Sequence, residues 1–223
     1  MVGSQARKMI HPSPTYPQPG LLEGFDHVNR FWDRSNGIWT AKILPGEFYV
    51  TQGKELISTV LGSCISVCIR DPVLGVAGMN HFMLPIQGEF STLDWGSAQT
   101  TSATRYGNWA MEFLINAILK AGGDRNRFEV KVFGGGQVLA NMTDIGQRNI
   151  LFALKYLKDE GFTPKAVDVG EVFPRKVLYF AQEGKVRVKK LTQVHNQTIL
   201  RREKDYMDRL KNTGKQSDIE LFD

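Results

Sequence analysis

Short strand-like runs follow one another from Ile38 onward, and they limit the folds open to this chain more than any other feature. The run IWTAKILPGEFYV is broken by Pro45 and Gly46 into two short strands, and ELISTVLGSC, ISVCIRD and VAGMNHFMLP continue the β character. The segment DPVLG, from Asp71 to Gly75, supplies turn chemistry before the last of these runs. This part of the chain therefore predicts a series of strands joined by short connections.

Two longer segments have apolar residues at the spacing of helices. TRYGNWAMEFLINAILKAGG repeats apolar residues such as Trp109 and Phe113 at helical intervals and ends at two glycines, as helices commonly do. TDIGQRNILFALKYLKDEG predicts a second helix, with Thr143 or Asp144 near its N-cap. FEVKVFGGGQVL between them predicts a strand that runs into three glycines, and AVDVGEVF, KVLYFA and KVRVKKL predict the closing strands. The sequence thus combines helices and strands and predicts the α/β class.

One domain with an extension at each end is the expected organisation. Residues 1–37 hold four of the nine prolines and predict a flexible, Pro-rich N-terminal extension. Residues 38–192 form the expected domain, and residues 193–223 predict a charged C-terminal tail that is partly helical. The polar stretch from Ile86 to Ser102 predicts a long loop, of the kind that often borders a functional site.

Composition argues against several classes of protein. Hydrophobic residues make up 42% of the chain and charged residues 23%, which is typical of a soluble globular protein. The sequence holds no secretion signal and no apolar run approaching the roughly 18 residues of a membrane-spanning helix, so we expect a cytoplasmic protein without membrane insertion. The net charge of +5 gathers in residues 175–190, where a strand pair would turn the charges toward solvent. No RNA-binding signature accompanies this segment, so a nucleic-acid partner is not expected.

The two cysteines, Cys64 and Cys68, lie four residues apart in one apolar run. That spacing is ill suited to a disulfide within a strand, so we expect free thiols in a reducing compartment. The apolar flanks of Cys68 favour a packed core thiol. Cys64 instead follows Gly62 and Ser63, small residues that let a substrate approach and leave backbone N–H groups free to bind an oxyanion. Taken alone, Cys64 is slightly more typical of a small buried hydrophobic residue than of a nucleophile.

His81 is the histidine of the predicted domain, seventeen residues after Cys64. A free thiol has a pKa near ~8.5, so a nucleophilic cysteine needs a base, which is commonly histidine. In a hairpin closed by the DPVLG turn, pairing of Arg70 with Gly75 puts Cys64 directly opposite His81, whereas pairing with Val76 puts the two side chains on opposite faces. The sequence leaves both registers open, and a buried core histidine is the competing interpretation.

These residues also carry a resemblance to a known family. TVLGSCISVCIRDPVLGVAGMNHFMLP closely resembles the signature of CheD, the family of chemoreceptor glutamine deamidases of bacterial chemotaxis. PGEFYV, TRYGNWAMEFLINAILKAGG, KVFGGGQVL, IGQRNILFALKYL and PRKVLYFAQEGKVRVKKL fall in the family's order and approximate spacing, so the resemblance covers about residues 40–192. The combination of LGSC, Asp-Pro, Asn-His-Phe-Met-Leu-Pro and Phe-Gly-Gly-Gly is specific, whereas each motif alone is weak.

The resemblance implies a fold, a reaction and a site. The implied fold is a layered α/β sandwich of mixed β-sheets with two main helices packed on one side. The implied reaction converts specific glutamines of chemoreceptors, the methyl-accepting chemotaxis proteins, to glutamates by thiol acyl transfer and thereby regulates adaptation. Cys64 is the implied nucleophile and His81 the general base, with backbone N–H groups around Gly62 and Ser63 as the expected oxyanion donors. Neither a metal nor an organic cofactor is needed.

Partners and alternatives follow from the same resemblance. Chemoreceptor cytoplasmic helices are the implied substrate, and a CheC-type phosphatase is an implied binding partner. A non-enzymatic chemotaxis adaptor with the same fold is the main alternative, and a Cys–His pair could also serve a protease or a transglutaminase. The family's third residue is a threonine hydroxyl that orients the histidine, for which both Ser58 and Thr59 are candidates. Gly170-Glu171 departs from the glycine pair that many members carry.

Overall fold

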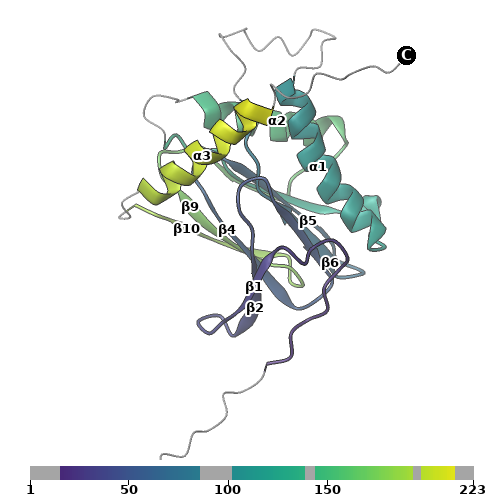
Figure 1. Ribbon diagram of the computed structural model, residues 1–223. Helices are drawn as coiled ribbons and strands as arrows, with labels where there is room; N and C mark the ends of the chain where they lie inside the picture. Colours follow the sequence, from purple (N-terminus) through teal and green to yellow (C-terminus); the bar gives the residue numbers. More distant parts are fainter. Residues whose placement is uncertain (1–15, 86–101, 139–143, 193–196, 214–223) are drawn as a thin grey trace, which may run out of the picture.

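The computed structural model describes residues 16–85, 102–138, 144–192 and 197–213 (Figure 1). Most of the predicted long loop, residues 86–101, lies outside the described residues, and so does Thr143. The segments that carry the candidate site are all described. They can therefore be followed from strand to strand.

Two five-stranded sheets form the centre of the described chain. The first has the order β1 (Asn29–Asp33), β2 (Ile38–Lys42), β4 (Glu55–Leu61), β9 (Arg175–Phe180) and β10 (Lys185–Lys190). The second has the order β3 (Phe48–Thr51), β6 (Val76–Asn80), β5 (Ile65–Asp71), β7 (Glu129–Gly134) and β8 (Ala166–Val169). Both sheets are mixed, because β2 runs parallel to β4 and β7 runs parallel to β8 while the other neighbours are antiparallel.

Helices cover the outer face of the second sheet. Helix α1 (Ser102–Lys120) packs on β3, β5 and β6, and α2 (Asp144–Asp159) packs on β5 and β7; a short 3-10 turn, η1 (Arg125–Arg127), precedes β7. Sandwiched between these helices and the first sheet, β5 and β6 are buried almost throughout. The prediction of a layered α/β sandwich with two main helices on one side is confirmed (Figure 1).

The apolar pattern of α1 predicted its helical state but not which residues face the core. Trp109 and Phe113 are 63% and 57% exposed, whereas the buried face is formed by Met111, Leu114, Ile115 and Ile118. An amphipathic helix with aromatic residues on both sides does not identify its inner face by spacing alone.

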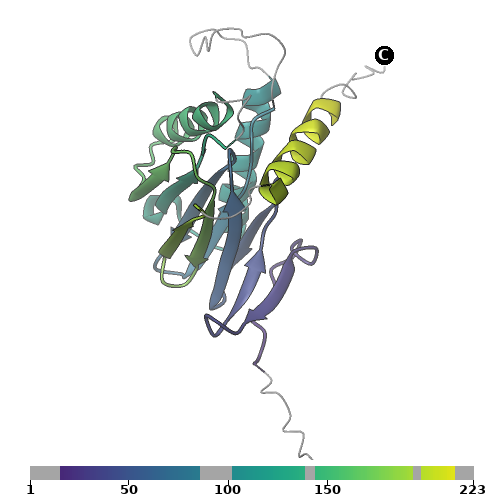
Figure 2. The ribbon, with the colours of Figure 1, turned by 90° about the vertical axis from the view of Figure 1, so that its left-hand side faces the viewer.

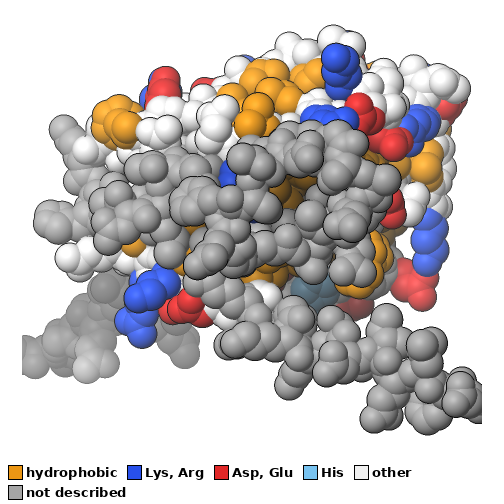
Figure 3. All heavy atoms as spheres, turned by 90° about the horizontal axis from the view of Figure 1, so that it is seen from above, with side chains coloured by type: hydrophobic (Ala, Val, Ile, Leu, Met, Phe, Trp, Pro, Cys, Tyr) orange, Lys and Arg blue, Asp and Glu red, His pale blue; other side chains and the backbone are white. Residues whose placement is uncertain are grey.

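The basic segment 175–190 forms β9 and β10, and most of its charged side chains face solvent as expected. Arg175 is the exception, with 1% of its surface exposed. Its guanidinium donates hydrogen bonds to the carbonyl oxygens of Gly134, Asp168 and Gly170, at 3.0, 2.7 and 2.6 Å. On the face shown in Figure 3, the coloured Lys and Arg side chains are interspersed with Asp and Glu.

Both predicted extensions contain regular structure next to the domain. β1 lies within residues 1–37 and pairs with β2, and Phe25 and Val28 just before it are buried. Helix α3 (Gln197–Thr213) lies within the predicted tail, and Figure 2 shows it beside the upper end of the sandwich, apart from α2. The division of the chain into domains stays a prediction. Among the described helices, none is long and apolar enough to cross a membrane.

The hairpin that carries the two candidate catalytic residues has neither of the two registers considered from the sequence. Arg70 pairs with Ala77 and Asp71 with Val76. Gly75 has a φ of +69°, so it belongs to the turn, and its N–H donates to the carbonyl oxygen of Asp71. This register is shifted by two residues from the first one considered, and a shift by two keeps each side chain on its original face.

Candidate functional site

Cys64 and His81 lie at the same end of the β5–β6 hairpin. Ile65 and Phe82 exchange two backbone hydrogen bonds, of 2.9 and 3.0 Å. Cys64 and His81 immediately precede these two residues, so they are diagonal neighbours on one face rather than direct partners. Diagonal neighbours in a sheet are separated by about 7 Å, which a thiol and an imidazole together can span. The hairpin therefore puts both side chains on one face, at the same end of the sheet.

In the loop that joins β4 to β5, residues 62–64, all of the carbonyl groups are turned away from the site. The N–H groups of Gly136 and Gly135 donate to the carbonyl oxygens of Gly62 and Cys64, at 2.8 and 2.7 Å. The side-chain amide of Asn149, which is completely buried in α2, donates to the carbonyl oxygen of Ser63 at 2.8 Å. These bonds fix the orientation of the loop and leave its N–H groups facing the opposite way.

The three N–H groups of this loop converge on a carboxylate from α3. Gly62 and Cys64 donate to Oε1 of Glu203 at 2.8 and 3.1 Å, and Ser63 donates to Oε2 at 2.8 Å. A Cβ atom at position 62 would lie 2.6 Å from Oε2, so glycine is what allows the carboxylate to come this close. Successive backbone N–H groups arranged in this way form an anion-binding nest. The N–H groups expected as oxyanion donors thus converge on one carboxylate, and their role in a reaction stays a prediction.

His81 is held by a hydroxyl group on the neighbouring strand β4. The side chain of Thr59 lies 2.7 Å from Nδ1 of His81 and 2.9 Å from the carbonyl oxygen of Ile43. A carbonyl oxygen accepts but does not donate, so the hydroxyl proton of Thr59 goes to Ile43 and Nδ1–H of His81 donates to Thr59. Nε2 then carries a free lone pair, and it has no hydrogen-bond partner among the described residues.

The same contact distinguishes the two candidates for the orienting residue. Thr59 is in hydrogen-bond contact with the imidazole. Ser58 precedes it in β4, and successive side chains of a strand point to opposite faces, so Ser58 faces away from His81. Of the two residues left open by the sequence, the geometry favours Thr59.

The backbone of His81 is fixed by the connection between β2 and β3. The N–H of His81 donates to the carbonyl oxygen of Glu47 at 2.9 Å, and the N–H of Gly46 donates to the carbonyl oxygen of His81 at 2.7 Å. Gly46 has a φ of +90°, a conformation that favours glycine. The Pro45-Gly46 break predicted from the sequence therefore also positions the histidine.

Both candidate catalytic groups are uncharged in this arrangement. Burial, the negative charge of Glu203 and a hydrogen bond to its carboxylate raise the pKa of the Cys64 thiol well above its ordinary value. Burial also lowers the pKa of His81 to about 3. Both side chains are almost completely enclosed, and this burial favours the neutral thiol and the neutral imidazole.

Little space remains around these groups. A cavity of about 20 Å³ is bordered by Thr59, His81 and Glu203, together with residues of the β2–β3 connection and of α3. A cavity of that size holds about one water molecule. Among the described residues, no three His, Cys, Asp or Glu side chains lie close enough together to hold a metal ion.

Known proteins with related sequences share most of this chain. The family model described as CheD chemotactic sensory transduction matches residues 83–190. The chain is 51% identical over 204 residues to a protein of Halorhodospira halophila, covering 92% of this chain and 94% of that protein. It is 49% identical over 206 residues to one of Hahella chejuensis, covering 92% and 96% of the two chains. Both relatives bear the name "Probable chemoreceptor glutamine deamidase CheD". The chain belongs to the CheD family.

A third CheD relative, from Hydrogenovibrio crunogenus, is 50% identical over 190 residues, covering 85% of this chain and 97% of its own, and it bears the same name. The motifs that carried the resemblance in the sequence thus identified the family correctly. The family-model match begins at residue 83, two residues after His81. The family-model match therefore includes neither Cys64 nor His81, and a catalytic role for either residue stays a prediction.

Two residues of this CheD site were not predicted from the sequence. Asn149 gave no signal beyond its place in a helix, although an asparagine within an otherwise apolar helix face is a candidate for a buried hydrogen bond. Glu203 lies in a segment rich in charges of both signs, where one more acid is not distinctive. The signal that could have found it is its spacing from Tyr206 and Met207, three and four residues later on one helix face.

Proposed function

We propose that this protein is a protein-glutamine deamidase that converts glutamines of chemoreceptors to glutamates. The names of its relatives support the substrate class. The observation that carries the proposal is the nest of three N–H groups around Cys64, which binds the carboxylate of a glutamate side chain beside the thiol. Glutamate is the product that hydrolysis of a glutamine side chain leaves behind.

The reaction begins with transfer of the Cys64 proton to Nε2 of His81, which has the free lone pair. The thiolate attacks the carboxamide carbon of the substrate glutamine, and the carbonyl oxygen becomes an oxyanion bound by the N–H groups of Gly62, Ser63 and Cys64. Each such donor is worth roughly 10²–10³ in rate when it meets the developing charge.

Collapse of this intermediate breaks the C–N bond. The imidazolium of His81 gives its proton to the leaving nitrogen, and ammonia departs, leaving a thioester on Cys64. A water molecule that gives a proton to His81 then attacks the thioester carbon, and the thiol is released with a glutamate side chain on the substrate. Thr59 holds Nδ1–H through both halves of the reaction, which leaves Nε2 as the nitrogen that exchanges protons.

The deamidation changes a neutral amide into a carboxylate on the receptor. The proposed substrate is the cytoplasmic helical region of a chemoreceptor, and each event alters the charge between receptor helices. This is how the protein would regulate adaptation. A CheC-type phosphatase as a second binding partner stays a prediction.

Intact-mass analysis of a chemoreceptor cytoplasmic fragment tests the reaction. Incubation with the wild-type protein is expected to add about 1 Da per converted glutamine, because an NH₂ group is replaced by OH. Cys64→Ala and His81→Ala are expected to leave the mass unchanged over the same time. A fragment that keeps its mass with the wild-type protein would contradict the proposal and favour the adaptor alternative. A gain in mass with Cys64→Ala would instead contradict the role of Cys64 as the nucleophile.

A further inference from the structure

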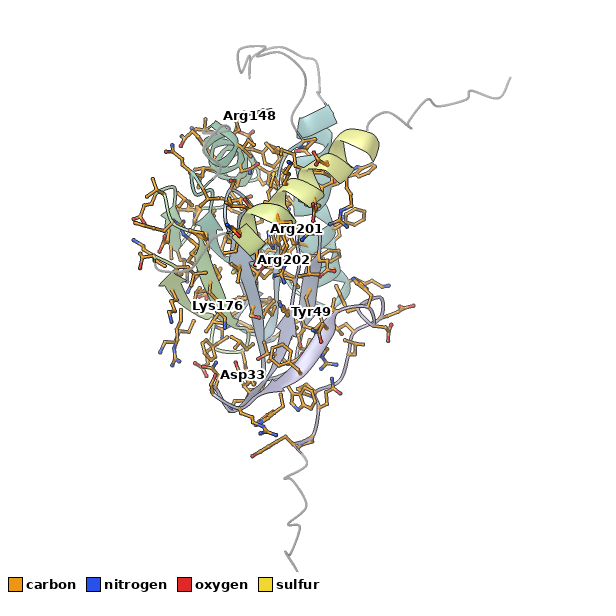
Figure 4. The ribbon with its side chains drawn as sticks, turned by 60° about the vertical axis from the view of Figure 1, so that its left-hand side comes forward. Asp33, Tyr49, Arg148, Lys176, Arg201 and Arg202 are labelled. Atoms are coloured by element: carbon orange, nitrogen blue, oxygen red, sulfur yellow. The ribbon has the colours of Figure 1, made fainter. Side chains whose placement is uncertain are left out.

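Helix α3 presents one buried face to the rest of the molecule. Glu203, Tyr206 and Met207 are 2%, 6% and 2% exposed, and Leu210 is half-buried. Their spacing of three, four and seven residues places all four on one side of the helix. Figure 4 shows the start of α3, with Arg201 and Arg202 labelled, lying across the strands of the sandwich. The acid at position 203 is therefore directed inward among otherwise apolar and aromatic contacts.

A carboxylate is costly to bury unless hydrogen bonds replace its water. The carboxylate of Glu203 accepts three backbone N–H hydrogen bonds. The donors are Gly62, Ser63 and Cys64, the proposed nucleophile. A helix that needed a hydrophobic contact alone would place an apolar residue there. A glutamate side chain is the product of the proposed deamidation. The carboxylate of Glu203 therefore occupies the proposed oxyanion donors as the reaction product would.

Docking of α3 also closes the site. Cys64 is completely buried, and the space beside Glu203 and His81 holds no more than about one water molecule. A substrate glutamine cannot reach the thiol while Glu203 occupies the nest. The negative charge of Glu203 beside Cys64 additionally disfavours formation of the thiolate.

We propose that α3 binds as an internal substrate mimic, in which Glu203 takes the place of the carboxamide of a receptor glutamine and the surface beneath α3 is the docking surface for a receptor helix. This inference rests on the proposed deamidase function. It adds that the free protein is autoinhibited and that a substrate helix must displace α3.

The contacts of α3 describe the helix that would replace it. Tyr206 packs against Gly46, where a Cβ atom would come within 2.9 Å of the tyrosine ring, and its hydroxyl is hydrogen-bonded to that of Tyr106 on α1. A receptor helix that places glutamine in the nest thus sets its residue three positions later, in place of Tyr206, against the β2–β3 connection and α1, and its residue four positions later in place of the buried Met207. Apolar or aromatic residues at those positions are expected in good substrates.

The surface on which α3 packs leaves space for a receptor helix to replace α3. A groove of about 320 Å³ lies between α3 and the β2–β3 connection, bordered among others by Lys42, Glu47 and Arg202. The helix is therefore not packed tightly along its whole length. Because α3 is part of the same chain, its effective concentration at the site is on the order of millimolar, and it competes with receptors unless its own binding is weak.

Alkylation of Cys64 by iodoacetamide measures the docking of α3 without relying on deamidation. Four full-length proteins are compared by peptide mass analysis: the wild type, Glu203→Ala, Glu203→Gln and Asp208→Ala. Asp208 is an exposed acid on the same helix, so its variant is matched in charge to Glu203→Ala. We expect Glu203→Ala to raise the rate of Cys64 alkylation at least tenfold and Asp208→Ala to leave it unchanged. Cys68 serves in every sample as the buried thiol that reports global unfolding.

Equal alkylation rates of Cys64 in the wild type and in Glu203→Ala would overturn the proposal. A rise that is matched by Cys68 would also overturn it, because the cause would then be unfolding of the domain. The same variants are assayed on a receptor fragment, where Glu203→Ala is expected to deamidate faster than the wild type. Cys64 alkylation that responds to Glu203→Ala with no receptor deamidation in any variant would reject the proposed function and leave the docking of α3 intact.

Glu203→Gln tests whether position 203 lies where a substrate does. The variant carries a glutamine in the nest, and we expect Cys64 to hydrolyse it: the amide and one water give the glutamate carboxylate and ammonia. The peptide that contains residue 203 should gain about 1 Da in Glu203→Gln and stay unchanged when Cys64→Ala is added. A glutamine that persists at position 203 while receptor glutamines are converted would overturn the substrate-mimic assignment.

Discussion

Cys64 and Cys68 lie four residues apart on one hairpin, and by burial they are alike. They are 0% and 1% exposed, and burial raises the pKa of both thiols. Cys68 sits inside β5, between β6 and β7, so the sheet uses its backbone hydrogen-bonding groups. Cys64 sits one residue before β5, and its N–H joins those of Gly62 and Ser63 in the nest. Backbone donors that the sheet does not use, rather than exposure, distinguish the candidate nucleophile from the core thiol.

The largest expected effect separates these two thiols directly. Cys64→Ala is expected to lower kcat/KM for a receptor fragment by at least about 10³-fold, because the nucleophile is lost. Cys68→Ala leaves the nest intact and should change kcat/KM less than about threefold, while lowering the free energy of unfolding by about 1 kcal/mol for the lost packing. Initial rates by mass analysis and urea unfolding measure both. Similar losses of kcat/KM in the two variants would show that the difference between the thiols has no catalytic meaning.

The histidine adds a second difference between the thiols, since His81 lies at the same end of the hairpin as Cys64 and not as Cys68. Thr59→Val removes the hydroxyl that holds Nδ1–H and is expected to lower kcat about 10²-fold with little change in KM, because the base is no longer oriented. Thr59→Ser should restore most of the activity. Ser58→Ala is the matched control and should behave as the wild type. If Ser58→Ala were the more damaging change, the orienting role would belong to Ser58.

Much of this arrangement could be predicted from the sequence, because its determinants are local. Strand and turn patterns gave the hairpin, and the pairing of Cys64 with a histidine in the next strand gave a testable site. The register was wrong in detail because it depends on which residue closes the turn, and Gly75 lies within the turn rather than in a strand. A shift by one more residue would have put the two side chains on opposite faces.

The remainder depends on contacts between distant parts of the chain. Glu203 binds the N–H of a residue 139 positions earlier, and no local pattern reports such a contact.

Glu171 gives a more limited lesson. Its φ of +62° lies in the region that favours glycine, which agrees with the glycine pair that many family members carry there. Although Glu171 departs from the glycine pair, the chain still adopts at this position the conformation that favours glycine.

Stability against pH distinguishes His81 from both thiols. Neither thiol ionises between pH 5 and 7, because burial raises both pKa values. The pKa of His81 is lowered from 6.5 to about 3, so its contribution to stability is present above pH 6.5 and is lost as the pH falls toward 3. From pH 7 to pH 5 the free energy of unfolding should fall by about 2 kcal/mol.

Urea unfolding at several pH values checks this expectation, with His81→Asn as the control that removes the titrating group. Carboxylates such as Asp71, whose pKa is lowered by its hydrogen bonds to Arg127, lose their contribution below this window. The fall between pH 7 and 5 should persist in Cys68→Ala and disappear in His81→Asn. A pH dependence that is the same in His81→Asn would mean that the imidazole is not held neutral in the folded protein.

The smallest expected effect concerns the carbonyl groups of residues 62–64, the loop whose N–H groups distinguish Cys64 from Cys68. Asn149 donates to the carbonyl oxygen of Ser63 and accepts the N–H of Leu84 at 2.9 Å. Asn149→Ala leaves the Ser63 carbonyl free to rotate, which tilts the oxyanion donors, and kcat should fall about tenfold with KM nearly unchanged. Cys68→Ala is the control for lost stability, because it weakens the core without touching the loop. If Cys68→Ala lowered kcat as much as Asn149→Ala, general loosening of the core would explain the loss, and Asn149 would have no positioning role.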